Sequence, residues 1–425
     1  MAIETGALWA ETFTGEAVVP VRVVSGSGNW AVLSDGRRMF EALSGHSCLN
    51  LGHGHPDLLA AMASSAGRLS YCSPEHPSDP AMALAARLDG VLGGGYKLRY
   101  ALSGASANEI AIEVVRRRWS ARGQPEKRVI LSLVPSYHGN LGEAQFATGY
   151  AAFRVDGGER ADFVHIPGPM DESGHLRSGE EITEWLEALV DRLGAGVLAG
   201  LIAEPVNFAG GVIVPEPGYF VALARFCARH EVSFIVDEII TGFGRTGDWF
   251  GFEALLAGTG LRPDLVCMGK GLTAGYFPLA AVAVDADIHA ELAAADVTLK
   301  KVITMAGHPV GCDVALAQIG IVERDGLRAQ VVENAARIRA VLRGLEELAW
   351  VRDVRGRGHM WGIEFQAAGG RGRADIASAV ERHCLDRGLL VGAADGMLRI
   401  NPPLSMSDAE REEMLTGLCA AVTAA

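Results

Sequence analysis

The chain has 425 residues, of which 49% are hydrophobic and 21% charged, and its formal net charge is −13. This length allows one large domain and a smaller one, and the composition is ordinary for a globular protein. Acidic residues outnumber basic ones and no basic stripe runs along the chain, which argues against a nucleic-acid partner.

The first 49 residues contain a hairpin-like turn, Leu33-Ser34-Asp35-Gly36-Arg37. An Asp-Gly pair between two strand-like runs is typical of a tight β-turn. We expect residues 1–49 to join a small domain that is completed by the C-terminal part of the chain.

Between about residues 50 and 315, short apolar runs alternate with segments of helical periodicity. The helical segment 219–230, for example, places Phe220, Leu223 and Cys227 on one face. Apolar strands that alternate with amphipathic helices predict a mainly parallel sheet covered on both faces, an α/β large domain over 50–315. The predicted strands are 97–103, 128–133, 200–206, 233–237, 265–268 and 279–284.

After residue 315 the pattern changes to that of a smaller α+β domain, 316–425. A long helical pattern is followed by a strand-like, Gly-rich stretch, a second helix, a hairpin-like stretch and a final helix. The corresponding ranges are 329–348, 351–365, 375–387, the residues up to 400, and from about 408 onward.

Two polar residues follow predicted strands of the large domain. Asp237 ends the run Ser-Phe-Ile-Val-Asp, and Lys270 follows the run Leu-Val-Cys-Met between two glycines. Ligands of parallel sheets gather at the carboxyl ends of the strands. An acid and a lysine at this edge suit pyridoxal phosphate, because the lysine holds the cofactor as a Schiff base and the acid keeps the pyridine nitrogen protonated.

Two further segments lie just after predicted strands. Ser103, Gly104 and Ala105 open a helix, and small residues there leave backbone N–H groups free to hold a phosphate. Tyr137 and His138 follow the next strand, where an aromatic ring can stack on a pyridine. Taken alone, an ordinary capped turn and plain packing are the better interpretations of these two segments.

Together these motifs resemble a class III aminotransferase, the fold type I group that includes ornithine, 4-aminobutyrate and ω-amine transaminases. The string Asp-Glu-Ile-Ile-Thr-Gly-Phe-Gly-Arg-Thr-Gly at 237–247, with its downstream lysine, is highly specific for that group. The resemblance extends over nearly the whole chain, through the blocks 50–56, 203–206, 304–309 and 398–404.

The resemblance implies a seven-stranded, mainly parallel sheet and a homodimer with a shared active site. It implies that Lys270 forms the aldimine with pyridoxal phosphate and shuttles the proton, and that Asp237 pairs with the pyridine nitrogen. Further cofactor contacts are implied for Ser103, Gly104, Ala105, Tyr137, His138 and Glu204, and for Thr304 toward the neighbouring subunit's phosphate.

The resemblance also points to a substrate pocket formed by Tyr71, Phe208, Ala209 and Arg399, where Arg399 matches the carboxylate-binding arginine. Ornithine- and 4-aminobutyrate-type members carry a glutamate at the position of Ala209, which masks that arginine when the substrate is an amine. An alanine at this position is more like the ω-amine and pyruvate-using branch. It leaves Arg399 without an identified partner in the sequence. Ala105 stands where many relatives carry Ser or Thr, and Lys301-Val302-Ile303 stands where a His-Gly often precedes the block that begins at Thr304.

The predicted function is transfer of an amino group from an amine or amino-acid donor to a keto or aldehyde acceptor, through pyridoxamine phosphate. A class III racemase, epimerase or decarboxylase is the alternative, because such relatives share the lysine and the acid. A cofactor-binding regulator of DNA is disfavoured, because such proteins carry an added N-terminal helical module.

Seven scattered cysteines, with no CxxC pair and no zinc-ligand spacing, predict a reducing compartment and no metal site. The N-terminus has acids at Glu4 and Glu11 and no signal-like pattern, and we find no apolar run that could span a membrane. We therefore expect a cytoplasmic protein.

Overall fold

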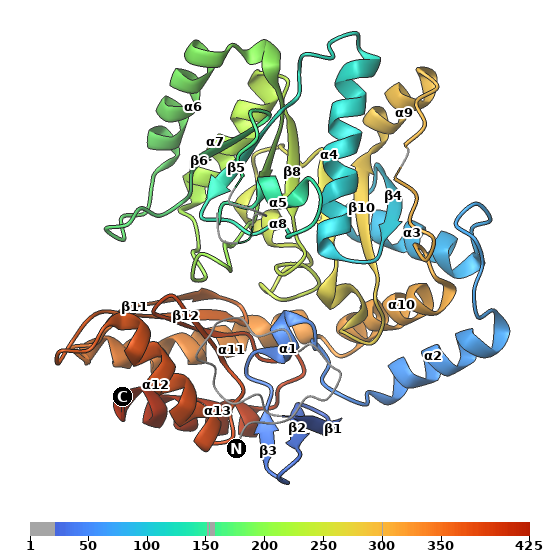
Figure 1. Cartoon of the computed structure of the whole chain (residues 1–425). Helices are drawn as coiled ribbons and strands as arrows, with labels where there is room; N and C mark the ends of the chain where they lie inside the picture. The colour runs from blue at the N-terminus through green and yellow to red at the C-terminus, as the bar shows by residue number, and fades with distance from the viewer. Residues whose placement is uncertain (1–21, 151–152, 154–157, 300) are drawn as a thin grey trace.

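The computed structural model describes residues 22–150, 153, 158–299 and 301–425. Of the predicted N-terminal segment, residues 1–21 lie outside this described part. Figure 1 shows a sheet flanked by helices in the upper half of the view, and below it a second group of elements formed by the two ends of the described chain.

The upper half is built around a seven-stranded sheet in the order β4-β10-β9-β8-β7-β5-β6. Only β10 runs antiparallel to its neighbours, so the expected α/β class with a mainly parallel sheet is confirmed. The strands are β4 (Tyr96–Ala101), β5 (Val129–Val134), β6 (Phe163–Pro167), β7 (Leu198–Ala203), β8 (Ser233–Asp237), β9 (Leu265–Met268) and β10 (Ala280–Asp285).

Both faces of this sheet are buried, because successive side chains of a strand point to opposite sides. In β8, Phe234 and Val236 enter one hydrophobic cluster and Ile235 enters another. The first cluster contains side chains of α2 (Pro56–Arg68), α3 (Asp79–Val91), α6 (Gly179–Leu193), α7 (Pro217–Arg229) and α10 (Pro309–Arg324). The second contains side chains of α4 (Gly104–Ala121), α5 (Ala144–Ala147) and α9 (Ala286–Ala294).

The lower half has its own core. A four-stranded antiparallel sheet of order β11-β12-β14-β13 packs with three helices around a separate hydrophobic cluster. Its elements are α11 (Leu327–Leu342), β11 (Val351–Arg357), β12 (Met360–Phe365), α12 (Arg373–Asp386), β13 (Gly392–Ala394), β14 (Met397–Ile400) and α13 (Asp408–Thr423). The sequence pattern predicts the division 50–315 and 316–425, but residue 315 lies within α10, whose side chains on both sides of that point enter the first cluster. We therefore propose the same two domains with the boundary after α10.

The N-terminal part of the described chain joins this lower half. Its antiparallel strands are β1 (Val23–Ser27), β2 (Trp30–Leu33) and β3 (Arg38–Phe40), with a tight turn at Asp35-Gly36. Phe40 forms a parallel bridge with Leu389, and Glu410 of α13 accepts hydrogen bonds from Asn29 Nδ2 and Trp30 Nε1, both at 3.0 Å. Figure 1 shows these strands beside α13.

Three element predictions need correction. β6 was not among the predicted strands; its five residues include Pro167 and only part of the strand is buried. β7 ends at Ala203 rather than residue 206, because Glu204 and Pro205 turn the chain away from the sheet. The helix predicted to reach 348 ends at Leu342 and tightens into a 3₁₀ turn, Arg343–Glu347.

No helix in the described ranges is both long and apolar enough to cross a membrane.

Candidate active site

The candidate residues gather at one edge of the seven-stranded sheet, where its parallel strands end. Asp237 is the last residue of β8, and Lys270 comes two residues after the end of β9, the neighbouring strand. Glu204 follows β7 directly, and the turn from β4 into α4 begins at Leu102. The topology therefore brings together residues from four separate segments of the chain, at positions 102, 204, 237 and 270.

Asp237 is 5% exposed and its carboxylate is held on both oxygens. Oδ2 accepts hydrogen bonds from Asn108 Nδ2 and His138 Nδ1, both at 2.8 Å, and Oδ1 accepts one from the backbone N–H of Ile239 at 3.1 Å. Asn108 Nδ2 also donates to the carbonyl of His138 at 2.8 Å. The orientation of this acid is thus fixed by two buried polar side chains.

Lys270 has an unusual backbone, with φ at +39°. A lysine in this left-handed region carries strain of about 1 to 3 kcal/mol, which proteins retain mostly at functional sites. The side chain is half-buried, and burial lowers the pKa of its amine, against the opposing charges of Asp237 and Glu204. A lysine with a lowered pKa has a larger neutral, nucleophilic fraction at pH 7.

The N-terminus of α4 faces the same edge. Ser103 and Ser106 cap it reciprocally: Ser103 Oγ accepts from the Ser106 N–H at 3.2 Å, and Ser106 Oγ accepts from the Ser103 N–H at 2.9 Å. Gly104 leaves no room for a side chain, because a Cβ there would come within 2.7 Å of Ile239 Cδ1. The N–H groups that follow the cap form a helix terminus suited to a phosphate.

Glu204 supports the segment that carries Tyr137. Its Oε1 accepts from the Tyr137 N–H at 3.1 Å, and its Oε2 accepts from the Phe208 N–H at 3.3 Å. Burial raises the pKa of Glu204 to about 7. The half-buried Tyr137 ring packs edge-on against Phe153, with centroids 5.1 Å apart.

The structure gives Arg399 a partner that the sequence left open. Arg399 Nη2 donates to the carbonyl of Ala209 at 2.9 Å, and its guanidinium lies 5.8 Å from the centroid of the Phe208 ring. Tyr150 Oη donates to the same carbonyl at 2.9 Å. Three of the four predicted pocket residues, Arg399, Phe208 and Ala209, are therefore together.

The fourth pocket residue, Tyr71, lies with Thr304. Tyr71 Oη donates to the Thr304 carbonyl at 3.0 Å, and both residues are exposed. No contact with Asp237 or Lys270 is recorded for either residue within the described part of the chain. Their predicted roles in the site remain predictions.

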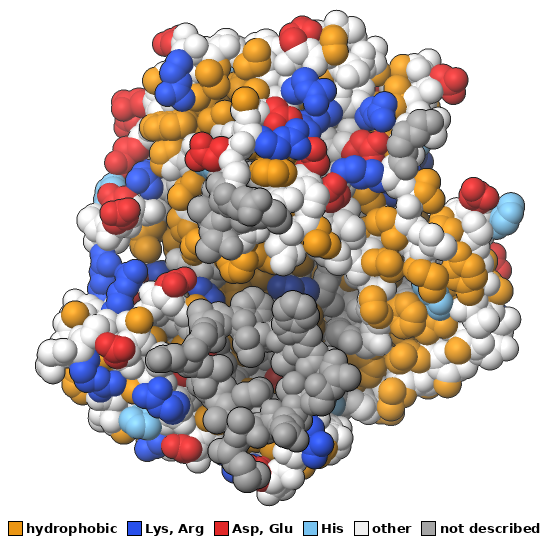
Figure 2. Space-filling view, viewed as in Figure 1, with side chains coloured by type: hydrophobic (Ala, Val, Ile, Leu, Met, Phe, Trp, Pro, Cys, Tyr) orange, Lys and Arg blue, Asp and Glu red, His pale blue; other side chains and the backbone are white. Residues whose placement is uncertain are grey.

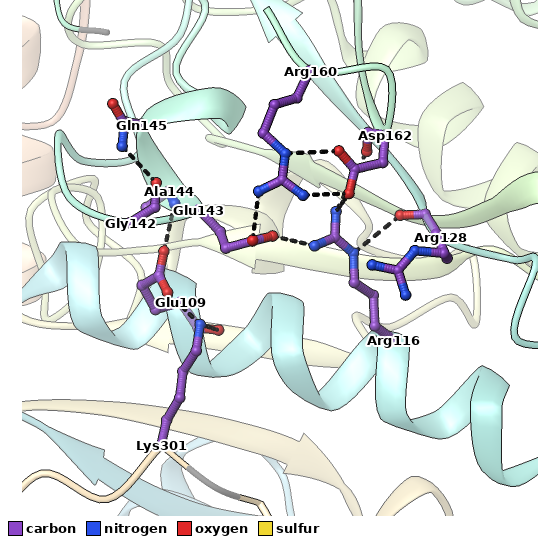
Figure 3. A network of polar contacts seen from close by, with 10 residues as sticks. All are labelled: Glu109, Arg116, Arg128, Gly142, Glu143, Ala144, Gln145, Arg160, Asp162 and Lys301. Carbon is purple, nitrogen blue, oxygen red and sulfur yellow. Dashed lines mark hydrogen bonds and ion pairs between the residues drawn. The ribbon is translucent and has the colours of Figure 1, made fainter. Parts of the chain in front are cut away.

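A charged network fastens three segments to α4 (Figure 3). Glu143 binds both Arg116 and Arg160, and Asp162 binds the same two guanidinium groups at 2.9 and 2.6 Å. Closer to the helix N-terminus, Glu109 accepts from the Ala144 N–H at 2.7 Å and from Lys301 Nζ. The loop after His138 and the segment before Thr304 are held by this network.

Asn108, Thr148 and Tyr150 were not predicted from the sequence. Asn108 is a fully buried amide on the apolar face of α4, and a polar residue that interrupts such a face is the signal that would have found it. Thr148 Oγ1 accepts a hydrogen bond from the His138 N–H at 2.9 Å and so helps to fix the backbone of His138. Nothing in the local sequence marks Thr148 or Tyr150.

Comparison with known proteins places this arrangement in a family. The class III aminotransferase profile matches residues 13–422. A putrescine–pyruvate aminotransferase of Pseudomonas aeruginosa is 31% identical over 90% of this chain and 86% of its own length. Among solved structures, an (S)-enantioselective ω-transaminase from Thermomicrobium roseum aligns with a TM-score of 0.91 at 32% identity, covering 98% of this chain and 96% of that one.

An amine transaminase from an uncultivated Pseudomonas species, solved with pyridoxal phosphate bound, aligns with a TM-score of 0.92 at 29% identity. The alignment covers 99% of this chain and 100% of the Pseudomonas chain. No group of three His, Cys, Asp or Glu side chains in the described ranges is placed to hold a metal ion. The chain belongs to the class III aminotransferases and is a pyridoxal-phosphate-dependent transaminase.

Proposed function

We propose that this enzyme moves an amino group from a simple amine donor to an oxo acid, with Lys270 and Asp237 as its catalytic residues. The observation that carries the proposal is the placement of these two side chains at the ends of adjacent strands, beside the capped N-terminus of α4. The likeness to ω-transaminases of known structure supports the amine as donor.

The donor set fits pyridoxal phosphate. The site supplies an amine of lowered pKa, a buried carboxylate fixed by Asn108 and His138, and a helix terminus with free N–H groups. When bound, the cofactor supplies an electron sink for the bond that breaks at the substrate carbon. We assign the phosphate to Ser103, Gly104 and Ala105, and the ring face to Tyr137.

Lys270 would carry the proton. Its Nζ would hold the cofactor aldehyde at rest and, once freed, would take the proton from the amine-bearing carbon of the donor. Burial lowers the pKa of Nζ and so favours the neutral base that this step needs. Asp237 Oδ1 and Oδ2 would hold the proton on the pyridine nitrogen, with His138 as a positioning residue behind the carboxylate.

Arg399 would bind the carboxylate of the oxo acid. A guanidinium with a fixed backbone partner on one nitrogen still offers several N–H donors in a planar fork. Because Ala209 supplies a carbonyl and no side-chain carboxylate, no acid at that position competes with the substrate. Phe208 narrows the space beside the guanidinium.

The test is the visible spectrum of the purified enzyme before and after single amine donors are added. We expect the visible band of bound pyridoxal phosphate to be replaced by the near-ultraviolet band of pyridoxamine phosphate, and pyruvate to reverse the change. A visible band that persists with every donor, while the substrate α-proton exchanges with solvent, would instead assign racemase or decarboxylase chemistry.

We further propose that the active unit is a homodimer. Tyr71 and Thr304 lie on a surface with several exposed apolar side chains, and Figure 2 shows hydrophobic side chains gathered on the right of the view, where α2, α3 and α10 lie. Exposed apolar surface of this kind marks protein interfaces. The apolar members are Leu69, Met82, Val302 and Met305.

Replacing both Val302 and Met305 with aspartate is expected to give monomers. Val302 is 69% exposed in the single chain, and two charges buried without partners would strongly disfavour association. Sedimentation should report one chain of 44.8 kDa in place of two, with roughly tenfold or greater loss of activity as Thr304 leaves the neighbouring site. Leu193→Asp, an exposed apolar residue at the end of α6, is the control and should stay dimeric. A wild-type monomer with full activity would refute the proposal.

We infer that the enzyme works in a reducing compartment such as the cytoplasm. All seven cysteines are free thiols, and four of them are buried. This cysteine usage supports the inference, because structural disulfides are the mark of oxidising compartments.

A further inference from the structure

Arg245 is a fully buried guanidinium where the two domains meet. Its exposed fraction is 0%, and no carboxylate pairs with it among the described residues. Burial lowers the pKa of Arg245 to about 9, so the side chain still carries its charge at neutral pH. Buried charges are normally paired, because water solvates an ion better than a protein interior does. A buried charge that lacks such a partner beside an active site is a candidate for a functional role.

Uncharged groups from two other segments hold this guanidinium. Arg245 Nη2 donates to Asn50 Oδ1 at 2.5 Å, and Nη1 donates to the carbonyl of Pro402. Nε is buried and has no hydrogen-bond partner in the described ranges. The backbone carbonyl of Arg245 accepts a hydrogen bond from the His359 N–H at 3.0 Å. Arg245 therefore joins the large domain to the hairpin between β11 and β12 and to the segment that follows β14, the strand of Arg399.

Asn50 lies between Arg245 and the turn that carries Lys270. Lys270 opens a 3₁₀ turn that ends at Thr273, and its φ of +39° strains the backbone there. Gly271 packs against the Asn50 amide so closely that a Cβ at Gly271 would lie 2.6 Å from Asn50 Nδ2. The amide that accepts the Arg245 bond therefore also contacts the residue next to Lys270.

The N-terminal segment contacts the same stretch of chain a second time. A Cβ at Gly275 would lie 3.3 Å from Cys48 Cβ, so the segment 48–50 lies along the turn from its second residue to beyond its end. Left-handed backbone at a lysine persists only where the surrounding contacts determine it. The bond that fixes the Asn50 amide is therefore expected to help hold the Lys270 turn in its strained shape.

We propose that Arg245 is a positioning residue for transamination, which acts through Asn50 to hold the Lys270 amine at the site of proton transfer. The inference rests on the proposed function, in which Lys270 is the catalytic lysine. A guanidinium suits this task because its planar fork is rigid and its charge strengthens the hydrogen bonds that it donates. Because a second acceptor, the Pro402 carbonyl, follows β14, the same side chain ties the lysine to the strand that carries Arg399.

The test is hydrogen exchange of the Lys270 turn in the holoenzyme, read by mass spectrometry. The N–H groups of Leu272 and Ala274 are bonded within the turn, at 2.9 and 3.2 Å, so their exchange reports its opening. Arg245→Met removes the charge and both side-chain bonds, and Asn50→Ala removes the acceptor with a smaller change. Arg245→Lys keeps a charged donor. Turnover is measured on the same samples.

We expect Arg245→Met and Asn50→Ala each to raise the exchange rate of the turn about tenfold, the size of effect that a hydrogen bond to a charged group produces. The double variant should exchange no faster than the faster single variant, because the two residues act as one unit. In Arg245→Met, kcat should fall roughly a hundredfold, as for a reacting group displaced by about 1 Å, with KM changed less than about threefold. Arg245→Lys should recover part of both losses.

Arg411→Met is the matched control, because it removes an arginine–asparagine bond of the same length far from the turn. Arg411 Nη1 donates to Asn334 Oδ1 at 2.5 Å, between α13 and α11 of the small domain. This variant should lose stability, as Arg245→Met does. It should leave the exchange of the Lys270 turn, and kcat per folded molecule, as in the wild type.

Unchanged exchange of the turn in Arg245→Met, or additive effects of the two single variants, would overturn the inference. So would equal changes in Arg411→Met. If Arg245→Met folds too poorly to measure, Asn50→Ala decides, and wild-type exchange in that variant would refute the role of Arg245. The proposed function fails differently: borohydride would attach the wild-type cofactor to a residue other than Lys270, a result that does not depend on exchange of the turn.

Discussion

Lys270→Ala is expected to lower turnover by about four orders of magnitude or more while leaving the fold intact. In the proposed mechanism this amine supplies both the covalent attachment of the cofactor and the base that moves the proton, and no other lysine follows a strand at this edge of the sheet within the described residues. Replacing it also removes a partly desolvated cation, and alanine remains compatible with the short 3₁₀ turn that begins there.

The measurement is single-turnover conversion of the cofactor band, with circular dichroism to confirm the fold. Lys97→Ala, an exposed lysine of β4, controls for loss of a positive charge and should retain wild-type rates. Because the cofactor can still bind without a covalent bond, the variant should contain pyridoxal phosphate that borohydride fails to attach. Retained turnover in Lys270→Ala would refute the assignment of the catalytic lysine.

Asp237→Asn is expected to reduce the rate by roughly a thousandfold, with a much smaller effect on cofactor binding. The amide keeps the shape of the side chain but carries no charge to stabilise a protonated pyridine nitrogen, so electron withdrawal from the substrate weakens. Asn108 Nδ2 and His138 Nδ1 both donate to Oδ2, so both lose their acceptor where the amide NH₂ takes that position, whereas an NH₂ in the place of Oδ1 removes the acceptor of the Ile239 N–H.

Glu238→Gln is a suitable control, because Glu238 is adjacent to Asp237 in the sequence and both carboxylates are buried. Glu238 accepts from Thr241 Oγ1 and from the N–H groups of Gly251 and Phe252, all structural contacts. This variant should lose stability and keep its rate per folded molecule within about tenfold. Equal rate losses in the two variants would show that the charge of Asp237 has no special role.

The sequence predicted the positions of Asp237 and Lys270 at the ends of two strands, because the pattern there is local. The bounds of β8 and β9 agree with the runs predicted for them, and fully buried strands leave a continuous apolar signature that ends at a polar residue. Asp237 and Lys270 follow directly from that rule. β6 was missed because it is short and only partly buried, so its pattern resembles a loop.

The supporting contacts were not predictable in the same way. Asn108 reaches Asp237 across 129 positions, and Arg399 reaches the Ala209 carbonyl across 190. A backbone carbonyl leaves no trace in a sequence, so the partner of Arg399 could not be deduced from the identity of Ala209. The left-handed turn at Ser44–Ser47 could not be predicted either, because only one of its four residues is a glycine.

The joining of the two ends of the chain has a consequence for how the protein is made. Asn29 and Ser44 leave the ribosome early, yet their partners Glu410 and Asn401 lie 381 and 357 positions later. At about 5 to 20 residues per second, the early segment waits on the order of 20 to 80 seconds for these partners. The seven-stranded sheet can assemble during that interval, whereas the contact of Arg399 with the Ala209 carbonyl forms only when synthesis is nearly complete.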